Sequence, residues 1–440
     1  MCTRHTRLRG LAAAAVIAAA AAVAVDAQGP RAPGAASARG FGGPSHWVGT
    51  WATALVMRAP AAAAGPGAPP LLNFNNQTLR QIVRVSIGGP QVRAVFSNAF
   101  GTAPLAIGGA AIALRDKGAA VVPVSSRTLT FSGKTAGSIA PGAVLVSDPV
   151  TLTVPDLADV AVDLYLPADT AASMSPIAHH TGNGALQTSY VSAPGNHAGA
   201  IELPVATTTL NYYFLSRVDV VAPEQVGAVV ALGDSITDGS RSTPDTNNRW
   251  PNHLARRLLS SGVRMGVLNA GIGGNRLLGD GNSQSALARF DRDVLSQAGA
   301  THLVILEGIN DLGNRTSRAK VDDLIAGHRQ LIARAHAQGL KAYGVTMTPF
   351  EATTIAPDYW SPEGEAARQA FNRWLRAGGE YDGVIDFEAV LRDPAEPTKV
   401  LLKFAAPDRL HPNDAGYEAL GNAVDVALFR RSGTGAGGSR

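Results

Sequence analysis

The chain has 440 residues, of which 45% are hydrophobic and 16% are charged, so it is not a largely disordered protein. Its 38 basic and 34 acidic residues nearly cancel, and they form no marked basic cluster, which argues against a nucleic-acid-binding protein. The length predicts two or three domains.

The first 27 residues have the pattern of a secretory signal peptide. Three arginines precede an apolar run from Leu11 to Val25, and a small-x-small pattern ends at Ala27. A membrane anchor is the alternative, but this run is short for a helix that needs ~20 residues to cross a bilayer. We therefore predict cleavage after Ala27, a secreted or periplasmic location, and no stable membrane insertion. The single cysteine, Cys2, lies inside this segment, so the mature chain would have no disulfide and no cysteine nucleophile.

Residues 28–45 are rich in Pro, Gly, Ala and Ser, and we predict that they form a flexible leader. Residues 46–221 then alternate apolar and polar residues, as β-strands do. Residues 78–87 and 91–97 flank Gly88-Gly89-Pro90, which predicts a β-hairpin. Further strands are predicted at 110–114, 127–131, 144–147, 150–154, 160–167 and 212–220. The pattern predicts an N-terminal β-sandwich domain over residues 46–221.

Buried strands alternate with helices in the rest of the chain. Continuous apolar strands are predicted at 226–232, 263–269, 302–306, 341–346 and 383–387. Helical spacing is found at 250–260, 283–298, 320–337, 363–378 and 413–430. This order predicts an α/β domain over residues 226–431, a three-layer α/β/α sandwich with a five-stranded parallel sheet. Residues 432–440, SGTGAGGSR, are predicted to be a disordered tail.

A Gly-Asp-Ser turn follows the first strand of this α/β domain. It puts Ser235 at the carboxyl edge of the sheet, where α/β sheets bind ligands. Gly233 permits a tight turn, and the following helix can present backbone N–H groups to an anion. An isolated turn of this kind is more often only a helix cap.

Near the other end of the chain, DRLHPN places Asp408 and His411 three residues apart in one loop. Asp408 can orient His411, and His411 can take the proton of Ser235. The alternative is a turn that is capped by the aspartate and leads into the last helix. The other histidines show no spacing that completes a set of metal ligands, so we predict no metal site.

Two further turns follow the second and third strands of the α/β domain. They read NAGIGGN at 269–275 and GIND at 308–311, and they contain a glycine N–H and an asparagine amide that can stabilise an oxyanion. The glycines can equally serve backbone conformation alone. Asp238 and Asp311, which lie beside these turns, are predicted to hydrogen-bond them, and Glu307 receives no role.

Taken together, the four turns resemble the sequence blocks of the SGNH/GDSL hydrolases. GDSITDG resembles the first block, GIGGN the second, GIND the third and DRLHPN the fourth. The resemblance implies the SGNH hydrolase fold, with Ser235 as nucleophile and His411 and Asp408 completing a triad. It implies an oxyanion hole formed by the N–H of Ser235, the N–H of Gly274 and the side chain of Asn310, with no metal or organic cofactor.

The first half of the chain also resembles a known type of domain. HWVGTWATA, TLRQIVRVSIGG and VRAVFSNAFG are similar to the β domain that precedes the hydrolase domain in a secreted SGNH subgroup likened to acetylxylan esterases. The resemblance implies a secreted serine esterase that acts on short-chain acyl or acetyl esters, with polysaccharide among the substrates, by way of an acyl-enzyme. Its partner would be a small-molecule or polysaccharide ester.

Three alternatives stay open at this point. The first is a lipase or general acylhydrolase on longer acyl chains, and the second is a non-catalytic carbohydrate-binding protein. The third is a phosphodiester or thioester hydrolase, although phosphate chemistry usually needs a metal or an Arg/Lys clamp, and Arg276 alone is not one. The oligomeric state is not indicated by the sequence.

Overall fold

The computed structural model describes residues 43–57, 72–171, 177–178, 186–313 and 318–430. The predicted signal peptide, most of the predicted leader and the predicted C-terminal tail lie outside these residues. Within the described ranges, no helix has the length and apolar character needed to cross a membrane.

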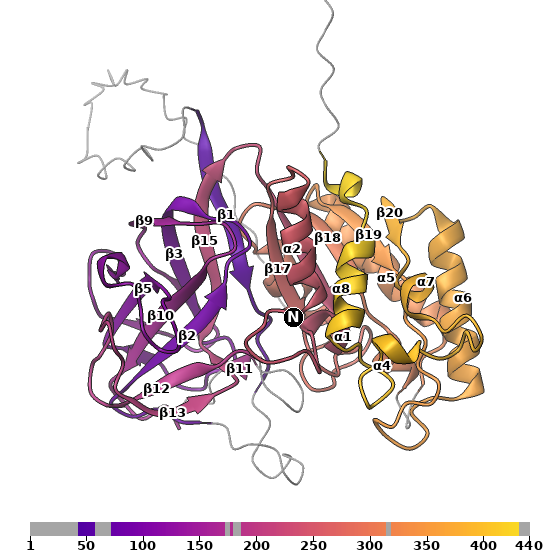
Figure 1. Cartoon of the computed structure of the whole chain (residues 1–440), viewed down its shortest axis with the longest axis horizontal. Coiled ribbons are helices and arrows are strands. Elements are labelled where there is room, and N and C mark those ends of the chain that lie inside the picture. The colour runs from indigo at the N-terminus through magenta and orange to yellow at the C-terminus, as the bar shows by residue number, and fades with distance from the viewer. Residues whose placement is uncertain (1–42, 58–71, 172–176, 179–185, 314–317, 431–440) are drawn as a thin grey trace, which may run out of the picture. The chain divides into compact units, whose positions relative to one another are not determined.

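The second half of the described chain is built around a five-stranded parallel sheet (Figure 1). Its order is β17 (Gly266–Gly271), β16 (Ala228–Gly233), β18 (Ala300–Leu306), β19 (Lys341–Val345) and β20 (Gly383–Ile385), and every neighbouring pair is parallel. The five-stranded parallel sheet predicted from the apolar runs is therefore confirmed.

Helices cover both faces of this sheet. Val229 and Ala231 of β16 pack into one cluster with α2 (Trp250–Ser260), α7 (Phe387–Leu391) and α8 (Asp414–Ala423). Their neighbours Val230 and Leu232 pack into another cluster with α3 (Ala286–Phe290), α5 (Val321–Ala337) and α6 (Pro362–Gly378). Successive strand residues point to opposite faces, and helices cover both faces, so β16 is buried along its whole length.

Two predicted helices are shorter than expected. The helix predicted at 283–298 is α3 followed by a π-helical turn, Asp291–Leu295. The helix predicted at 413–430 ends at Ala423, because Val424 is extended and the Asp425 side chain accepts from the N–H of Ala427 to begin a separate 3₁₀ turn. Further 3₁₀ turns are Pro123–Ser125 and Leu402–Phe404.

The first half of the described chain consists of strands in antiparallel sheets. One sheet has the order β1 (Ser45–Ala52), β15 (Leu215–Pro223), β3 (Gly89–Ser97) and β8 (Val144–Val146), with β9 (Val150–Val154) also paired to β3. The second has the order β13 (Val205–Thr209), β12 (Ser189–Pro194), β2 (Gln77–Arg84), β10 (Asp159–Leu166), β5 (Gly109–Leu114) and β6 (Arg127–Leu129). The pairs β4 (Leu105–Ile107) with β7 (Gly137–Ile139) and β11 (Ile177–Ala178) with β14 (Tyr212–Tyr213) complete this region.

One hydrophobic cluster joins these strands to the parallel sheet. It contains Val83 and Val162 from the six-stranded sheet and Val220 from the five-stranded antiparallel sheet. The same cluster continues to Val230 and Leu268 of the parallel sheet. The N-terminal part is thus a strand-rich region, and its status as a separate β-sandwich domain stays a prediction.

The hairpin predicted around Gly88-Gly89-Pro90 is wrong. β2 and β3 lie in different sheets, because β2 is already paired on both sides, with β10 and with β12. The chain crosses between the sheets at Gly88, where a Cβ would lie 1.9 Å from the carbonyl oxygen of Val154. Only glycine fits this crossing.

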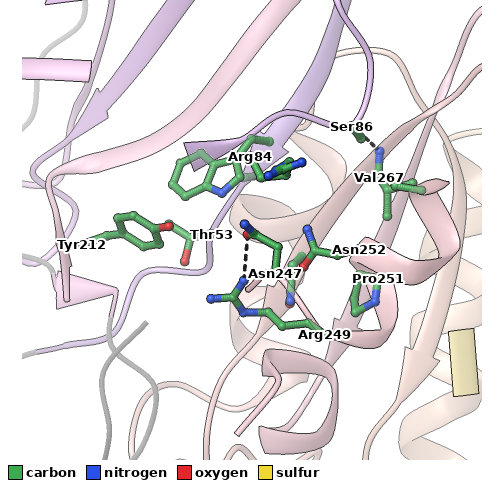
Figure 2. A pocket seen from close by; sticks show the side chains of 13 residues that line it. Thr53, Arg84, Ser86, Tyr212, Asn247, Arg249, Pro251, Asn252 and Val267 are labelled. Atoms are coloured by element: carbon green, nitrogen blue, oxygen red, sulfur yellow. Dashed lines mark hydrogen bonds between the residues drawn. The ribbon is translucent and has the colours of Figure 1, made fainter. Parts of the chain in front are cut away.

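The strand-rich region packs against edge strand β17. The N–H of Gly49 in β1 donates to the carbonyl of Ala298 at 2.8 Å, and the N–H of Val267 in β17 donates to the Ser86 hydroxyl at 2.9 Å. A Cβ at Gly266 would lie 2.0 Å from the carbonyl oxygen of Gly49, so the two backbones need a glycine here. Figure 2 shows a small pocket at this contact, with Arg84, Tyr212 and Arg249 in its lining. The pocket has a volume of about 40 Å³.

Candidate active site

Ser235 is the first residue of the short helix α1 (Ser235–Asp238), directly after β16. Asp234 caps this helix, because its Oδ1 accepts from the N–H of Ile236 at 2.8 Å. A Cβ at Gly233 would lie 2.1 Å from the Thr237 hydroxyl and 2.8 Å from the carbonyl oxygen of Leu306, so this turn tolerates only glycine. The tight turn fixes Ser235 at the carboxyl edge of the parallel sheet.

A chain of hydrogen bonds runs from Ser235 through His411 to Asp408. Nε2 of His411 lies 2.8 Å from Oγ of Ser235, and Nδ1 of His411 lies 2.9 Å from Oδ2 of Asp408. All three residues are buried, with exposed fractions of 5%, 6% and 8% for Ser235, His411 and Asp408. A carboxylate at Nδ1 favours the tautomer that leaves Nε2 free to accept the serine proton.

The loop around Asp408 holds its carboxylate in place. Oδ1 accepts from the N–H groups of Leu410 and His411 at 3.1 and 3.0 Å. Burial acts to raise the pKa of Asp408, but the hydrogen bonds from the side chain and backbone of His411 and from Leu410 outweigh it and hold the pKa well below its usual range. The carboxylate therefore stays ionised throughout the range in which a histidine works as a base.

Asn310 belongs to α4 (Ile309–Leu312), which follows Gly308 at the end of β18. The Tyr359 hydroxyl donates to Oδ1 of Asn310 at 2.6 Å, and Nδ2 of Asn310 donates to the carbonyl of Asn275 at 2.7 Å. These two partners orient the amide, and they use only one of the two Nδ2 hydrogens. Within the described part of the chain the second hydrogen has no acceptor, so it is available to a bound anion.

Gly274 and Asn310 line one pocket of about 470 Å³. Its other lining residues are Arg276, Asp280, Gly281, Asn282, Gly313 and Tyr359. Gly274 has φ +73°, and a Cβ there would lie 2.3 Å from Nδ2 of Asn282, so glycine is required on both conformational and steric grounds. The structure thus brings Gly274 and Asn310 together here and joins Ser235, His411 and Asp408 in a separate hydrogen-bonded chain.

A buried arginine behind these turns was not predicted from the sequence. Arg289 is fully buried and donates to the carbonyls of Gly233 and Ala270, to Oδ1 of Asn275 and to the carboxylates of Asp293 and Glu307. It therefore joins the carboxyl ends of β16, β17 and β18. The spacing of Arg289 and Asp293, four residues apart in a predicted helix, was the one signal in the sequence.

Three buried carboxyl groups beside these turns, those of Asp234, Glu307 and Asp311, influence one another's protonation. Burial raises the pKa of Asp234 to about 7, and the Asp311 carboxylate adds to the rise, while the Ile236 N–H and Arg289 oppose it. Burial also raises the pKa of Glu307 well above its usual value, with a further contribution from Asp234. Asp311 accepts from the N–H groups of Leu277 and Leu278 at 2.8 and 3.0 Å, which is the structural role predicted for it.

A raised carboxyl pKa makes the folded state bind protons more tightly than the unfolded chain does. The stabilising contribution of Asp234 is therefore full below about pH 4 and is lost as the pH rises to about 7. We expect Asp234→Asn, which keeps an oxygen that can cap α1, to remove this loss. In urea unfolding, the variant should gain stability relative to the wild type between about pH 5 and about pH 8. If the free energies of unfolding of the variant and the wild type differ by the same amount at about pH 5 and at about pH 8, the raised pKa of Asp234 is contradicted.

Among the described residues, no group of three or more His, Cys, Asp or Glu side chains is placed to hold a metal ion. The arrangement of Ser235, His411 and Asp408 is instead suited to nucleophilic attack by an activated hydroxyl.

Residues 231–419 match the model of the GDSL-like Lipase/Acylhydrolase family. No curated protein matches the chain. Solved structures similar to it include an acetyl xylan esterase from Geobacillus stearothermophilus, at 21% identity over 45% of this chain and 94% of that one, with a TM-score of 0.35. They also include a lipase/acylhydrolase from Enterococcus faecalis, at 21% identity over 46% of this chain and 93% of that one, with a TM-score of 0.36. A GDSL-like lipase from Bacteroides thetaiotaomicron is 19% identical over 46% of this chain and 87% of that one, with a TM-score of 0.35.

Proposed function

We propose that the protein is a serine esterase that hydrolyses short-chain acyl esters, above all acetyl esters, on the premise that residues 231–419 match the model of the GDSL-like Lipase/Acylhydrolase family. The observation that carries the proposal is the buried hydrogen-bond chain Ser235–His411–Asp408. A serine hydroxyl is a poor nucleophile unless a base of this kind takes its proton.

The proposed reaction proceeds through an acyl-enzyme. Oγ of Ser235 attacks the ester carbonyl while Nε2 of His411 takes the hydroxyl proton, and the ionised Asp408 stabilises the imidazolium. His411 then protonates the departing alcohol as the tetrahedral intermediate collapses. Water, activated in turn by His411, releases the acid and restores the serine.

The proposed oxyanion hole has three donors: the N–H of Ser235, the N–H of Gly274 and Nδ2 of Asn310. The charge on the carbonyl oxygen develops only as the tetrahedral intermediate forms, so fixed donors lower the barrier rather than tighten substrate binding. The two hydrogen bonds that orient the Asn310 amide support its part in this role, since they fix the donor before substrate arrives.

The pocket beside Asn310 favours a polar alcohol over a long acyl chain. Arg276, Asp280, Asn282 and Tyr359 offer charged groups, an amide and a hydroxyl, whereas a long acyl chain needs an apolar groove that removes its methylenes from water. We infer that the leaving group is a sugar or another polyhydroxylated alcohol, polysaccharide included.

A phosphonate probe with an aryl leaving group tests the nucleophile directly. We expect one covalent adduct, located on Ser235 by peptide mass spectrometry. His411→Ala should slow labelling sharply, because the hydroxyl then has no base. Labelling at another residue, or none under conditions that modify a known serine esterase, would overturn the proposed function.

The acyl-chain preference is tested with nitrophenyl esters from acetate to palmitate. We expect kcat/KM to be highest for acetate and to fall by at least about 10-fold by octanoate. The reason is that added methylenes gain no binding energy against the charged and polar side chains that line the pocket. Release of acetate from acetylated xylan is then the next measurement. Rates that rise towards palmitate would favour the lipase alternative and exclude the acetyl-ester proposal.

We also propose that the protein is exported and that residues 46–221 and 226–431 are two domains. The proposed export rests on residues 1–27, whose sequence resembles a signal peptide. N-terminal sequencing of protein from the culture fluid or periplasm is expected to begin at Gln28. An intact Met1 on the exported protein would contradict the cleavage.

A further inference from the structure

The segment of residues 240–249 joins helix α1, which begins with Ser235, to helix α2. Three of its residues have left-handed backbone conformations without being glycine: Arg241 at φ +72°, Asp245 at +64° and Asn247 at +54°. Such conformations are unfavourable for residues with a Cβ, so contacts elsewhere must hold the segment in this shape.

One end of this segment reaches the catalytic carboxylate. Nε of Arg241 donates to Oδ2 of Asp408 at 2.8 Å, and this is the same oxygen that Nδ1 of His411 contacts. The Arg241 side chain is 43% exposed, whereas the Asp408 side chain is 8% exposed, so the arginine approaches the buried acid from the surface. Asp408 is therefore held by two side chains, one of which belongs to the 240–249 segment.

The other part of the segment is bound to the strand-rich region through Asp245. Its Oδ1 accepts from Nε2 of Gln187 and from the N–H of Thr188, both at 2.7 Å, and its Oδ2 accepts from the Thr188 hydroxyl at 2.6 Å. The N–H of Asp245 also donates to the carbonyl of Leu186 at 2.9 Å. These partners directly precede β12, which is paired with β2 inside the six-stranded sheet.

Figure 2 shows the last part of the segment at the same contact. Asn247 and Arg249 line the small pocket together with Thr53 and Tyr212 of the strand-rich region. The segment thus touches the N-terminal strands over much of its length, while α8 holds its first part through the Tyr417 hydroxyl, which donates to the carbonyl of Ser240 at 2.6 Å.

We propose that the strand-rich region positions the catalytic aspartate: Asp245 fastens the 240–249 segment to residues 187–188, and Arg241 transmits this position to Asp408. The inference rests on the proposed function, because it takes Asp408 as the acid of the triad. Arg241 and Asp245 are positioning residues, since they act through Asp408 and not on the substrate. A small displacement of Asp408 would turn the imidazole away from Ser235 and slow the chemical step.

Asp245→Ala tests the proposal, with Asp156→Ala as the matched control. Asp156 also joins the strand-rich region to the α/β half, since it accepts from Arg264, but it has no hydrogen bond to the 240–249 segment. We expect Asp245→Ala to lower kcat by about 10-fold with KM within about 2-fold, and Asp156→Ala to leave both nearly unchanged. Equal kcat values for Asp245→Ala and wild type, at a temperature where both are folded, would overturn the inference.

Two milder variants cover the case in which Asp245→Ala fails to fold. Thr188→Val removes one hydroxyl donor at nearly constant volume and should lower kcat by about 2- to 3-fold, in the same direction. Asp245→Asn keeps an acceptor for the N–H of Thr188 and should retain most of the wild-type kcat. The proposal would be contradicted if Thr188→Val kept the wild-type kcat. It would also be contradicted if folded Asp245→Asn had a kcat as low as that expected for Asp245→Ala.

A double-mutant cycle shows whether Arg241 and Asp245 act along one route. If they do, Arg241→Met combined with Asp245→Ala lowers kcat no further than the more damaging single change. Independent, multiplicative losses would overturn the inference. The failure of this inference can be told apart from the failure of the proposed function. If esterase activity survives in Ser235→Ala, the proposed function is wrong. If Ser235→Ala loses its activity while Asp245→Ala keeps the wild-type kcat, only this inference is wrong.

Discussion

Ser235→Ala is expected to lower kcat for nitrophenyl acetate hydrolysis by about 10⁶-fold, the loss seen when the nucleophile of a triad is removed from another serine hydrolase. The physical reason is that the Ser235 hydroxyl is the group that lies 2.8 Å from Nε2 of His411, in a position to attack. What remains is binding and oxyanion stabilisation acting on water, worth roughly 10³–10⁴-fold over the uncatalysed reaction. Initial rates at saturating ester measure the loss.

The control for Ser235→Ala is its stability. Among the described residues, His411 is the one hydrogen-bond partner of the Ser235 side chain, so thermal unfolding should change little. His411→Ala, alone or combined with Ser235→Ala, should lower kcat to the same level, because the members of a triad act as one unit. Activity of more than a few per cent in the serine variant would show that a different residue is the nucleophile.

Asn310→Ala is expected to lower kcat by about 10²–10³-fold, as the loss of one oxyanion donor does in other acyl hydrolases. KM should change little, because the donor meets its full charge only in the transition state. Stopped-assay rates across a range of ester concentrations separate the two parameters.

Tyr359→Phe serves as the graded comparison for Asn310→Ala. The phenylalanine lacks the hydroxyl that donates to Oδ1 of Asn310, so the amide is less firmly oriented while its donor remains. We expect a loss of about 10-fold, smaller than that of Asn310→Ala. If Asn310→Ala lowers kcat by less than Tyr359→Phe does, Asn310 is not an oxyanion donor.

The α/β half could be predicted closely because its strands are buried on both faces. The apolar runs at 226–232 and 302–306 overlap β16 and β18, and the helix predicted at 250–260 has the bounds of α2. Burial on both faces and helical spacing are properties of short segments, and the sequence contains them directly.

The strand-rich half was harder because pairing depends on distant segments. Alternation of apolar and polar residues located β2 and β3 in the sequence. Whether the two strands share a sheet depends on β10 and β12, which pair with β2 and lie far along the sequence. β13 was missed because its sequence, VATTT, is mostly exposed and carries no apolar alternation. Sequence patterns describe a strand's faces better than its neighbours.

The candidate site, too, could be predicted only in part, because some of its residues stand in recognisable turns and others depend on distant contacts. Ser235, Gly274, Asn310, Asp408 and His411 stand in short turns whose residue types indicate chemistry on their own. The sequence did not indicate a role for Arg241, because its partner Asp408 lies 167 residues away along the chain. Glu307 and Arg289 are only 18 residues apart, but their meeting depends on how the ends of β16 and β18 are packed.

The pairing of the first strand with the last strand of the N-terminal half has a consequence for synthesis. β1 pairs with β15 from Ser45 opposite Pro223 to Ala52 opposite Arg217, and β15 is its only strand partner within that sheet among the described residues. At ~5–20 residues per second, the ribosome delivers that partner roughly 10–30 s after β1 has emerged. During this interval Val48 and Trp51 have no strand beside them, so the nascent chain carries an aggregation-prone edge. In protein made without residues 1–27, which folds where it is synthesised, a permuted gene that encodes β1 directly after β15 would shorten this wait and should raise the soluble yield.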